Sequence, residues 1–256
     1  MSAGHGTHGL YVARESALHD LPPECKLVAA LAFVVAVVVT PREAFWAFAA
    51  YAVVVGVVAR LGDIPFLHLA RRLTLELPFL GFAFFLPIVG QGERIDVLGL
   101  SLSISGLWGT WNILVKGTFG VAIASLLVAT TPIASLLQAL DRLRVPRVIT
   151  AIAGFMVRYL DVVGGELRRM TVARQSRGHD PHWFWQARAV ASTAGSLFVR
   201  SFERGERVHL AMMSRGYDGR LPVVHAVPVA RGATWSRSLA MPAVAVLVCA
   251  AAWVVR

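Results

Sequence analysis

The sequence predicts an all-α, polytopic membrane protein, a bundle of about five spanning helices joined to two long amphipathic helices. Composition is the first observation, because 56% of the 256 residues are hydrophobic and only 16% are charged. In a soluble domain, roughly a quarter of all residues are charged. The second observation is that apolar residues gather in long runs with almost no charge. The third is one long polar segment, 141–220, in which apolar residues recur with helical spacing.

Five apolar runs are the candidate membrane spans. A spanning helix needs about 17–25 apolar residues, so the two shortest runs must borrow from their flanks or form a tight hairpin. Roughly four to six spans are compatible with the sequence. The runs cover residues 27–39, 44–59, 73–90, 106–140 and 239–255.

Two charged residues interrupt the runs, Glu76 in the third and Lys116 in the fourth. We expect Glu76 near the cytoplasmic end of its span, paired with Arg72 four residues earlier. We expect Lys116 near the outer end, where a lysine can extend its ammonium group to water. In this topology the two residues lie at opposite membrane faces.

Charge decides the predicted orientation. The net charge is +10, and residues 141–220 contain fourteen arginines, seven acids and no lysine. Basic segments next to spans stay in the cytoplasm. The connection 60–72 is also basic, whereas 91–105 has one arginine and two acids. We therefore expect a multi-pass protein of the cell inner (plasma) membrane, with the N terminus and residues 141–238 cytoplasmic and no secretory signal peptide.

The predicted order along the chain has five parts. A cytoplasmic arm (1–26) precedes a transmembrane block of about four helices (27–140). A basic cytoplasmic block of two helices (141–220) and a linker (221–238) follow, and the last transmembrane helix is 239–256. In the basic block, a stripe that includes Ile149, Ile152 and Met156 predicts a helix over 147–177. A second, less regular stripe predicts a helix over about 183–215.

Each predicted helix of the basic block ends in the same short string. Ser176–Arg177–Gly178 ends the first and Ser214–Arg215–Gly216 ends the second, 38 residues later. A glycine just past a helix closes it in a left-handed turn. A guanidinium at such a tip is always charged and offers paired hydrogen bonds to an acidic partner. One copy is an ordinary helix ending, but two copies at equivalent places favour a function for both.

At this repeated string the chain resembles the T components of energy-coupling factor (ECF) transporters, and within them the CbiQ-like branch associated with cobalt uptake. Family members carry two Ala-Arg-Gly-type strings at the ends of two long cytoplasmic coupling helices. Here serine replaces the common alanine at Ser176 and Ser214. Ala173–Arg174–Gln175 is a competing alignment for the first string, with Arg174 as the alternative, but we prefer Arg177 because Gly178 follows it and the second copy has the same form. The resemblance covers about residues 10–225.

The resemblance implies a non-catalytic membrane subunit of an ATP-driven importer. Its partners would be two ATP-binding ABC subunits and a metal-binding, CbiM-like substrate-capture membrane subunit. Arg177 and Arg215 would each enter a groove on one ATPase, and closure of the ATPase pair would push the coupling helices. ATP would be bound by the partners, and this chain would bind no cofactor. The implied cargo is cobalt ion for cobalamin synthesis, with nickel or a vitamin as the alternatives.

Rival functions have weaker support in the sequence. An enzyme would need convergent acids, histidines or a nucleophile in the spans, and no phosphate-binding Gly-x-x-x-x-Gly-Lys-Ser/Thr string is present. His5, His8 and His19 lack carboxylate or thiolate companions, so we expect no metal site. A stand-alone membrane protein with a basic lipid-binding block remains the alternative, because fourteen arginines attract anionic surfaces. We expect no nucleic-acid partner.

Overall fold

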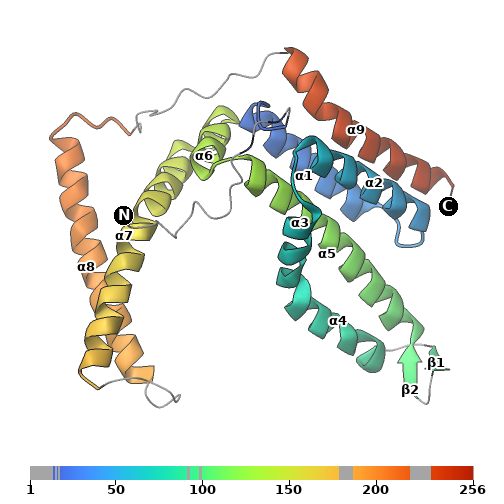
Figure 1. Cartoon of the computed structure of the whole chain (residues 1–256), viewed down its shortest axis with the longest axis horizontal. Coiled ribbons are helices and arrows are strands. Elements are labelled where there is room, and N and C mark those ends of the chain that lie inside the picture. Colours follow the sequence, from blue (N-terminus) through green and yellow to red (C-terminus); the bar gives the residue numbers. More distant parts are fainter. Residues whose placement is uncertain are drawn as a thin grey trace. The chain divides into compact units, whose positions relative to one another are not determined.

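The computed structural model describes residues 14, 16, 18–90, 93–97, 100–178, 187–219 and 232–255. It divides into two compact units, coloured along the chain in Figure 1. The two-helix unit consists of α7 (Arg147–Ser176) and α8 (Ala187–Met213). The membrane unit contains the other elements, which are α1 (Pro23–Val39), α2 (Phe45–Leu61), α3 (Phe66–Leu73), a 3-10 turn (Thr74–Glu76), α4 (Leu77–Val89), β1 (Arg94–Val97), β2 (Leu100–Ser103), α5 (Ile104–Thr130), α6 (Ile133–Arg142) and α9 (Gly232–Val254).

Polar side chains that bond to backbone carbonyls fix the direction of α5 against α1. Lys26 Nζ, near the start of α1, donates to Thr130 O at the end of α5, over 3.1 Å. Lys116 Nζ, in the middle of α5, donates to Val38 O near the end of α1, over 2.6 Å. The two helices are therefore antiparallel. Each ammonium group also satisfies a carbonyl that would otherwise be unpaired in an apolar setting.

Helix α9 runs parallel to α1. Trp253 Nε1, at the end of α9, donates to Val39 O, at the end of α1, over 3.2 Å. Half-way along α9, the Ala245 carbonyl accepts from the Tyr51 hydroxyl of α2, also over 3.2 Å. The first and last of the described helices therefore start at the same end of the membrane unit. This is the arrangement that an odd number of spans requires.

The core of the membrane unit is built around Tyr51. This side chain is fully buried and packs edge-on against Phe33 of α1, with ring centroids 5.6 Å apart. Phe119 of α5 packs against it in the same way at 6.0 Å. The Thr40 hydroxyl lies 2.7 Å from the phenol oxygen. The aromatic cluster therefore joins three helices, and its one polar tip is satisfied.

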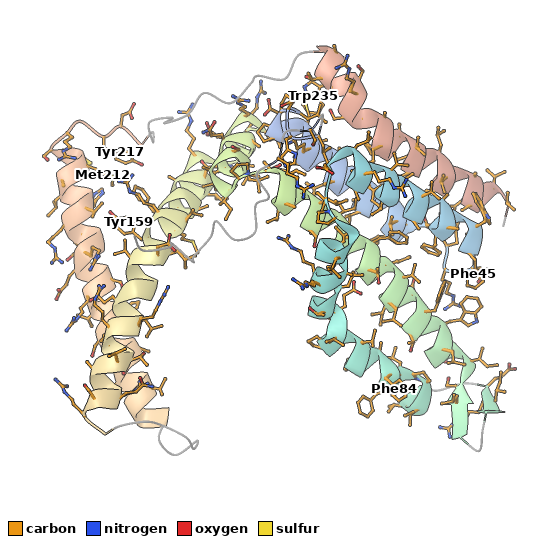
Figure 2. The ribbon with its side chains drawn as sticks, in the orientation of Figure 1. Phe45, Phe84, Tyr159, Met212, Tyr217 and Trp235 are labelled. Carbon is orange, nitrogen blue, oxygen red and sulfur yellow. The ribbon has the colours of Figure 1, made fainter. Side chains whose placement is uncertain are left out.

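The apolar outer surface of the membrane unit suits a hydrocarbon environment. On α4, Phe82 and Phe84 are 69% and 75% exposed, and Figure 2 shows Phe84 projecting away from the ribbon. Among the described helices of this unit, α5 and α9 are long and apolar enough to cross a membrane, judged by length and composition, and α7 of the two-helix unit meets the same criteria. Helices α2 and α4 are shorter apolar helices. These features identify a membrane protein, as the sequence predicts.

Two of the predicted spans are divided in the structure. The third, 73–90, spreads over α3, a 3-10 turn and α4, and the break comes before Pro78, which lies at the start of α4. The fourth, 106–140, ends at Thr130, and a separate helix, α6, begins after Pro132. Proline lacks the N–H that helix continuation requires, so both breaks have the same cause. The sequence analysis also missed the antiparallel β1–β2 hairpin between α4 and α5.

The expected positions of Glu76 and Lys116 at opposite membrane faces are wrong. Glu76 Oε2 accepts a hydrogen bond from Thr118 Oγ1, 2.9 Å away, two residues along α5 from Lys116. Both charged residues therefore lie level with the middle of α5. Lys116 is directed at α1 instead, through its bond to Val38.

Candidate functional site

The first copy of the repeated string forms the C-terminal tip of α7. Helix α7 ends at Ser176, Arg177 is its cap, and Gly178 has a φ of +78°. The amide of Arg177 donates to Arg174 O over 3.1 Å, and that of Gly178 donates to Gln175 O over 2.9 Å. The Ser176 hydroxyl bonds back to Ala173 O over 3.0 Å. The last turn is thus tightened, and the exposed Arg177 lies just beyond the helix.

The second copy forms the tip of α8 with the same geometry. Gly216 also has a φ of +78°, and its amide donates to Met213 O over 3.0 Å. The Ser214 hydroxyl bonds back three residues, to Ala211 O, over 3.0 Å. Arg215 is exposed. The sequence repeat is therefore also a structural repeat, and the predicted helix ends are confirmed at both glycines.

Both helix tips carry an exposed arginine, Arg177 or Arg215. Neither Arg177 nor Arg215 makes a hydrogen bond or ion pair within the part of the chain that the structure describes. Each arginine follows the last turn of its helix, at the negative end of the helix dipole, where a positive charge is stabilised. An exposed, pre-positioned guanidinium can form two parallel bonds to one carboxylate.

Arg174, the competing residue in the first string, is placed differently. Its side chain is half-buried, and Nη1 donates to Thr193 Oγ1 of α8 over 3.2 Å. Its Nε is buried and has no hydrogen-bond partner among the described residues. Arg174 therefore bonds to the companion helix, whereas Arg177 is exposed at the rim of the crevice between the helices and makes no such bond among the described residues. The geometry favours Arg177 as the residue available to a partner.

Glu166 joins the two helices of this unit. It is the buried acid of α7, and its two oxygens accept from Arg200 Nη1 at 3.3 Å and from Arg204 Nη2 at 2.8 Å. Both arginines lie on α8. The sequence alone did not indicate this role for Glu166. The spacing of Arg200 and Arg204, one helical turn apart, is the signal that could have indicated a shared acidic partner.

A polar crevice and an apolar cavity lie between α7 and α8. The crevice, of about 610 Å³, is lined by four arginines and three hydroxyl residues around Glu166. The apolar cavity, of about 400 Å³, is lined in part by Phe155, Tyr159, Val208 and Met212, and Figure 2 shows Tyr159 and Met212 on the two helices. The crevice residues are Arg169, Arg174, Arg177, Arg200, Ser192, Thr193 and Ser196.

The histidines of the sequence analysis supply no metal centre in the described residues. His5 and His8 lie outside those residues, and the His19 ring is engaged by the Ser16 hydroxyl at 2.8 Å. No group of three or more histidine, cysteine, aspartate or glutamate side chains gathers within the described ranges.

Comparison with known proteins gives one consistent family. A family model described as CbiQ, cobalt transport protein, matches residues 14–225. The chain is 31% identical over 155 residues to a fused cobalt transport protein, CbiMQ, of Methanocorpusculum labreanum, which covers 57% of this chain and 26% of that protein. It is 27% identical over 223 residues to the energy-coupling factor transporter transmembrane protein EcfT of Bacillus selenitireducens, covering 82% of this chain and 83% of EcfT.

A third relative is the cobalt transport protein CbiQ of Rhodobacter capsulatus, 32% identical over 105 residues, which are 41% of this chain. The chain spans about half the length of several curated relatives that it matches, 43% for this one and 55% for a Methanocaldococcus jannaschii protein.

Proposed function

The chain belongs to the CbiQ family of cobalt transport proteins, and on this premise we propose that it is the coupling T component of an energy-coupling factor importer. In this role it transmits ATP-driven motion from two ATP-binding ABC subunits to a substrate-capture membrane subunit. Its matches to CbiMQ, CbiQ and EcfT proteins support this role.

The duplicated helix tip is the observation that carries the proposal. Two exposed guanidiniums, Arg177 and Arg215, end two helices in the same backbone geometry. Two helix tips of the same geometry are suited to binding two equivalent ATP-binding subunits. We propose that each arginine, with its serine and glycine neighbours, enters an acidic groove on one ATPase subunit and bonds to a carboxylate there.

The same unit has the mechanical properties of a lever. Helix α7 has 30 residues and α8 has 27, so at about 1.5 Å per residue each is some 40 Å long. The contacts of Glu166 with Arg200 and Arg204 hold the two helices together. Displacement of the tips by ATPase closure would then move both helices as one body. We propose that this motion rearranges the capture subunit and releases its cargo.

The family name suggests the cargo, and the distribution of charge along the sequence suggests the orientation. We propose cobalt ion as the cargo, supplied by a metal-binding capture subunit, with nickel or a vitamin as the alternatives. The proposed location is the inner (plasma) membrane, with the N terminus and the two-helix unit in the cytoplasm, where the ATP-binding subunits reside. ATP binds to those partners, and this chain hydrolyses nothing.

Copurification of the ATP-binding subunits tests the proposal. With the importer subunits coexpressed, Arg177→Ala and Arg215→Ala together should abolish retention of the ATPases on this chain, with its membrane insertion unchanged. Arg168→Ala is the matched control, because Arg168 is an exposed arginine of α7 outside the crevice. Equal losses from the control would favour the rival, a basic block that binds anionic lipid through its summed charge.

A further inference from the structure

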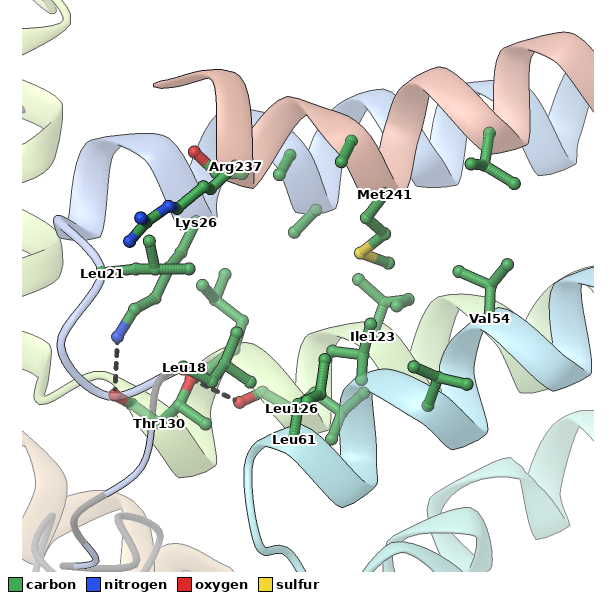
Figure 3. A pocket seen from close by; sticks show the side chains of 18 of the residues that line it. Leu18, Leu21, Lys26, Val54, Leu61, Ile123, Leu126, Thr130, Arg237 and Met241 are labelled. Carbon is green, nitrogen blue, oxygen red and sulfur yellow. Dashed lines mark hydrogen bonds between the residues drawn. The ribbon is translucent and has the colours of Figure 1, made fainter. Parts of the chain in front are cut away.

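Four helices of the membrane unit enclose an apolar groove of about 400 Å³, seen in close-up in Figure 3. The residues contributed by α1 and α5 are deeply placed, among them Ala29, Ile123 and Leu126, each at most 6% exposed. The residues from α2 and α9 are open, with Val53 65% and Val244 46% exposed. The groove is therefore closed at its base and open to the surroundings between α2 and α9.

One end of this groove holds two cationic side chains. Figure 3 shows the Lys26 and Arg237 side chains at the same end, with Lys26 Nζ bonded to Thr130 O. Lys26 Nζ also donates to His19 O over 3.1 Å, so the ammonium group has one N–H left. Arg237 is exposed and has no hydrogen bond or ion pair among the described residues. Asp20, exposed before α1, is the acid whose charge reaches Lys26.

The rest of the lining is aliphatic and cannot hold a polar molecule. Apart from Lys26 and Arg237, its polar members are Ser238 and Thr130. The Thr130 hydroxyl is bonded to its own helix at Leu126 O, and the Ser238 hydroxyl to Thr234 O. An open apolar groove in a bilayer is filled by hydrocarbon, because neither water nor an unpaired polar group is stable there.

We propose that the groove is a binding site for an anionic phospholipid. An acyl chain lies along the aliphatic lining, and the headgroup phosphate accepts hydrogen bonds from Arg237 and from the free N–H of Lys26. Lys26 and Arg237 bring two cationic side chains to the same end of the groove, and a guanidinium is well matched to phosphate oxygens. The small side chains of Ala29 and Ala30 leave the space that the lipid acyl chain would occupy.

The site lies at the membrane face where both α1 and α9 begin. In the orientation of the proposed function, this is the cytoplasmic face, whose leaflet carries the anionic lipids. The lipid would occupy a place between the first and last helices of the chain, which are in contact but far apart in sequence. The inference concerns a ligand of the membrane unit and does not depend on the contacts that Arg177 and Arg215 make.

Native mass spectrometry of the full chain in mild detergent tests the site. Delipidated protein is offered dioleoyl phosphatidylglycerol or dioleoyl phosphatidylcholine, and the lipids retained per chain are counted. We expect one phosphatidylglycerol, with phosphatidylcholine held more weakly. Arg237→Gln should lower phosphatidylglycerol occupancy about fivefold, the factor expected for losing one cation at a lipid headgroup. It should leave phosphatidylcholine unchanged.

Matched variants separate the groove from the general surface. Ala30→Phe fills the base and should displace both lipids, whereas Leu247→Phe adds the same ring to α9 outside the lining and should displace neither. Arg42→Gln removes an exposed cation beside Trp108, away from the groove, and should match the parent chain. If Ala30→Phe fails to fold, the retention of phosphatidylglycerol by Arg237→Gln still tests the site, because Arg237 is exposed.

Three results would overturn the inference. They are equal retention of the two lipids, no retention by the parent chain, and a loss with Arg42→Gln as large as with Arg237→Gln. Cross-linking of Met241→Cys to a partner subunit in the assembled importer would also overturn it, since a protein helix would then occupy the groove. Retention of the ATPases by Arg237→Gln should be normal, so failure here is distinct from failure of the coupling role.

Discussion

The Glu166 carboxylate of α7 lies 2.8 Å from the Arg204 guanidinium of α8, across the crossing of the two long helices. With Arg200 on the other oxygen at 3.3 Å, this acid is the main polar link between the two helices. In the proposed mechanism, force reaches the tips of both helices. The link that makes them one body is therefore as important as the tips.

Glu166→Gln should loosen the two-helix unit. The Glu166 side chain is 12% exposed and Arg204 35%, so losing the charged bonds should cost about 1–3 kcal/mol. The distribution of distances between spin labels on α7 and α8, measured by double electron–electron resonance, should broaden. Glu203→Gln is the control, because within the described ranges Glu203 makes one ion pair, an exposed one with Arg207 at 3.9 Å. A broadening as large in the control would show that the Glu166 link is not special.

Gly178→Ala and Gly216→Ala should each misplace a tip. Both glycines have a φ of +78°, a conformation that costs an L-residue about 1–2 kcal/mol. ATPase retention should fall although the arginines remain. Gly195→Ala is the matched control, since Gly195 lies within α8 in open space and alanine favours a helix there. Normal retention by both tip variants would mean that the turn geometry does not position the arginines.

Gly106→Ala should destabilise the contact between α4 and α5. A Cβ at Gly106 would clash with the backbone oxygen of Leu86 and would lie 2.7 Å from Pro87 Cα. Such overpacking costs typically about 1–3 kcal/mol. Thermal unfolding in detergent should shift clearly downward. Gly120→Ala, on the same helix with nothing within 4 Å of the added carbon, should leave the transition unchanged or raised.

Tyr51→Phe should weaken the membrane unit without changing its packing. The ring contacts with Phe33 and Phe119 remain, but the hydroxyl bond to Ala245 O is lost. Thr40 keeps its bond to Ala36 O, so the expected loss is about 0.5–1.5 kcal/mol. Tyr217→Phe, on the tip of α8, is the control and should not change the unfolding of this unit. A Tyr51→Phe chain as stable as the parent would show that the buried bond contributes nothing net.

The helix tips could be predicted from sequence because their causes are local. A serine, an arginine and a left-handed glycine determine the end of a helix within a few residues. The sequence favoured Arg177 over Arg174 through the following glycine, but the bond that engages Arg174 could not be predicted, because Thr193 lies on the other helix. The role of Glu166 was hidden for the same reason, since its partners are 34 and 38 residues away.

The apolar runs predicted membrane helices correctly but not their breaks. Thr74–Glu76 reads as part of one span, yet the structure turns there before Pro78. Hydropathy records the environment of a segment, whereas a break depends on backbone hydrogen bonds that proline removes. The level of Glu76 was misjudged because charge counting assigns a face to a connection and gives no depth within the bilayer.

Site-specific cross-linking from the two tips tests the central claim most directly. The variants Ser176→Cys and Ser214→Cys place a cysteine next to each coupling arginine. Each cysteine is treated with a short bifunctional cross-linker in membranes that contain all importer subunits. We expect both positions to cross-link to ATP-binding subunits, one subunit each, with yields that change when nucleotide is added. Cross-links to neither ATPase, or labelling of both cysteines from the outer side of the membrane, would contradict the account.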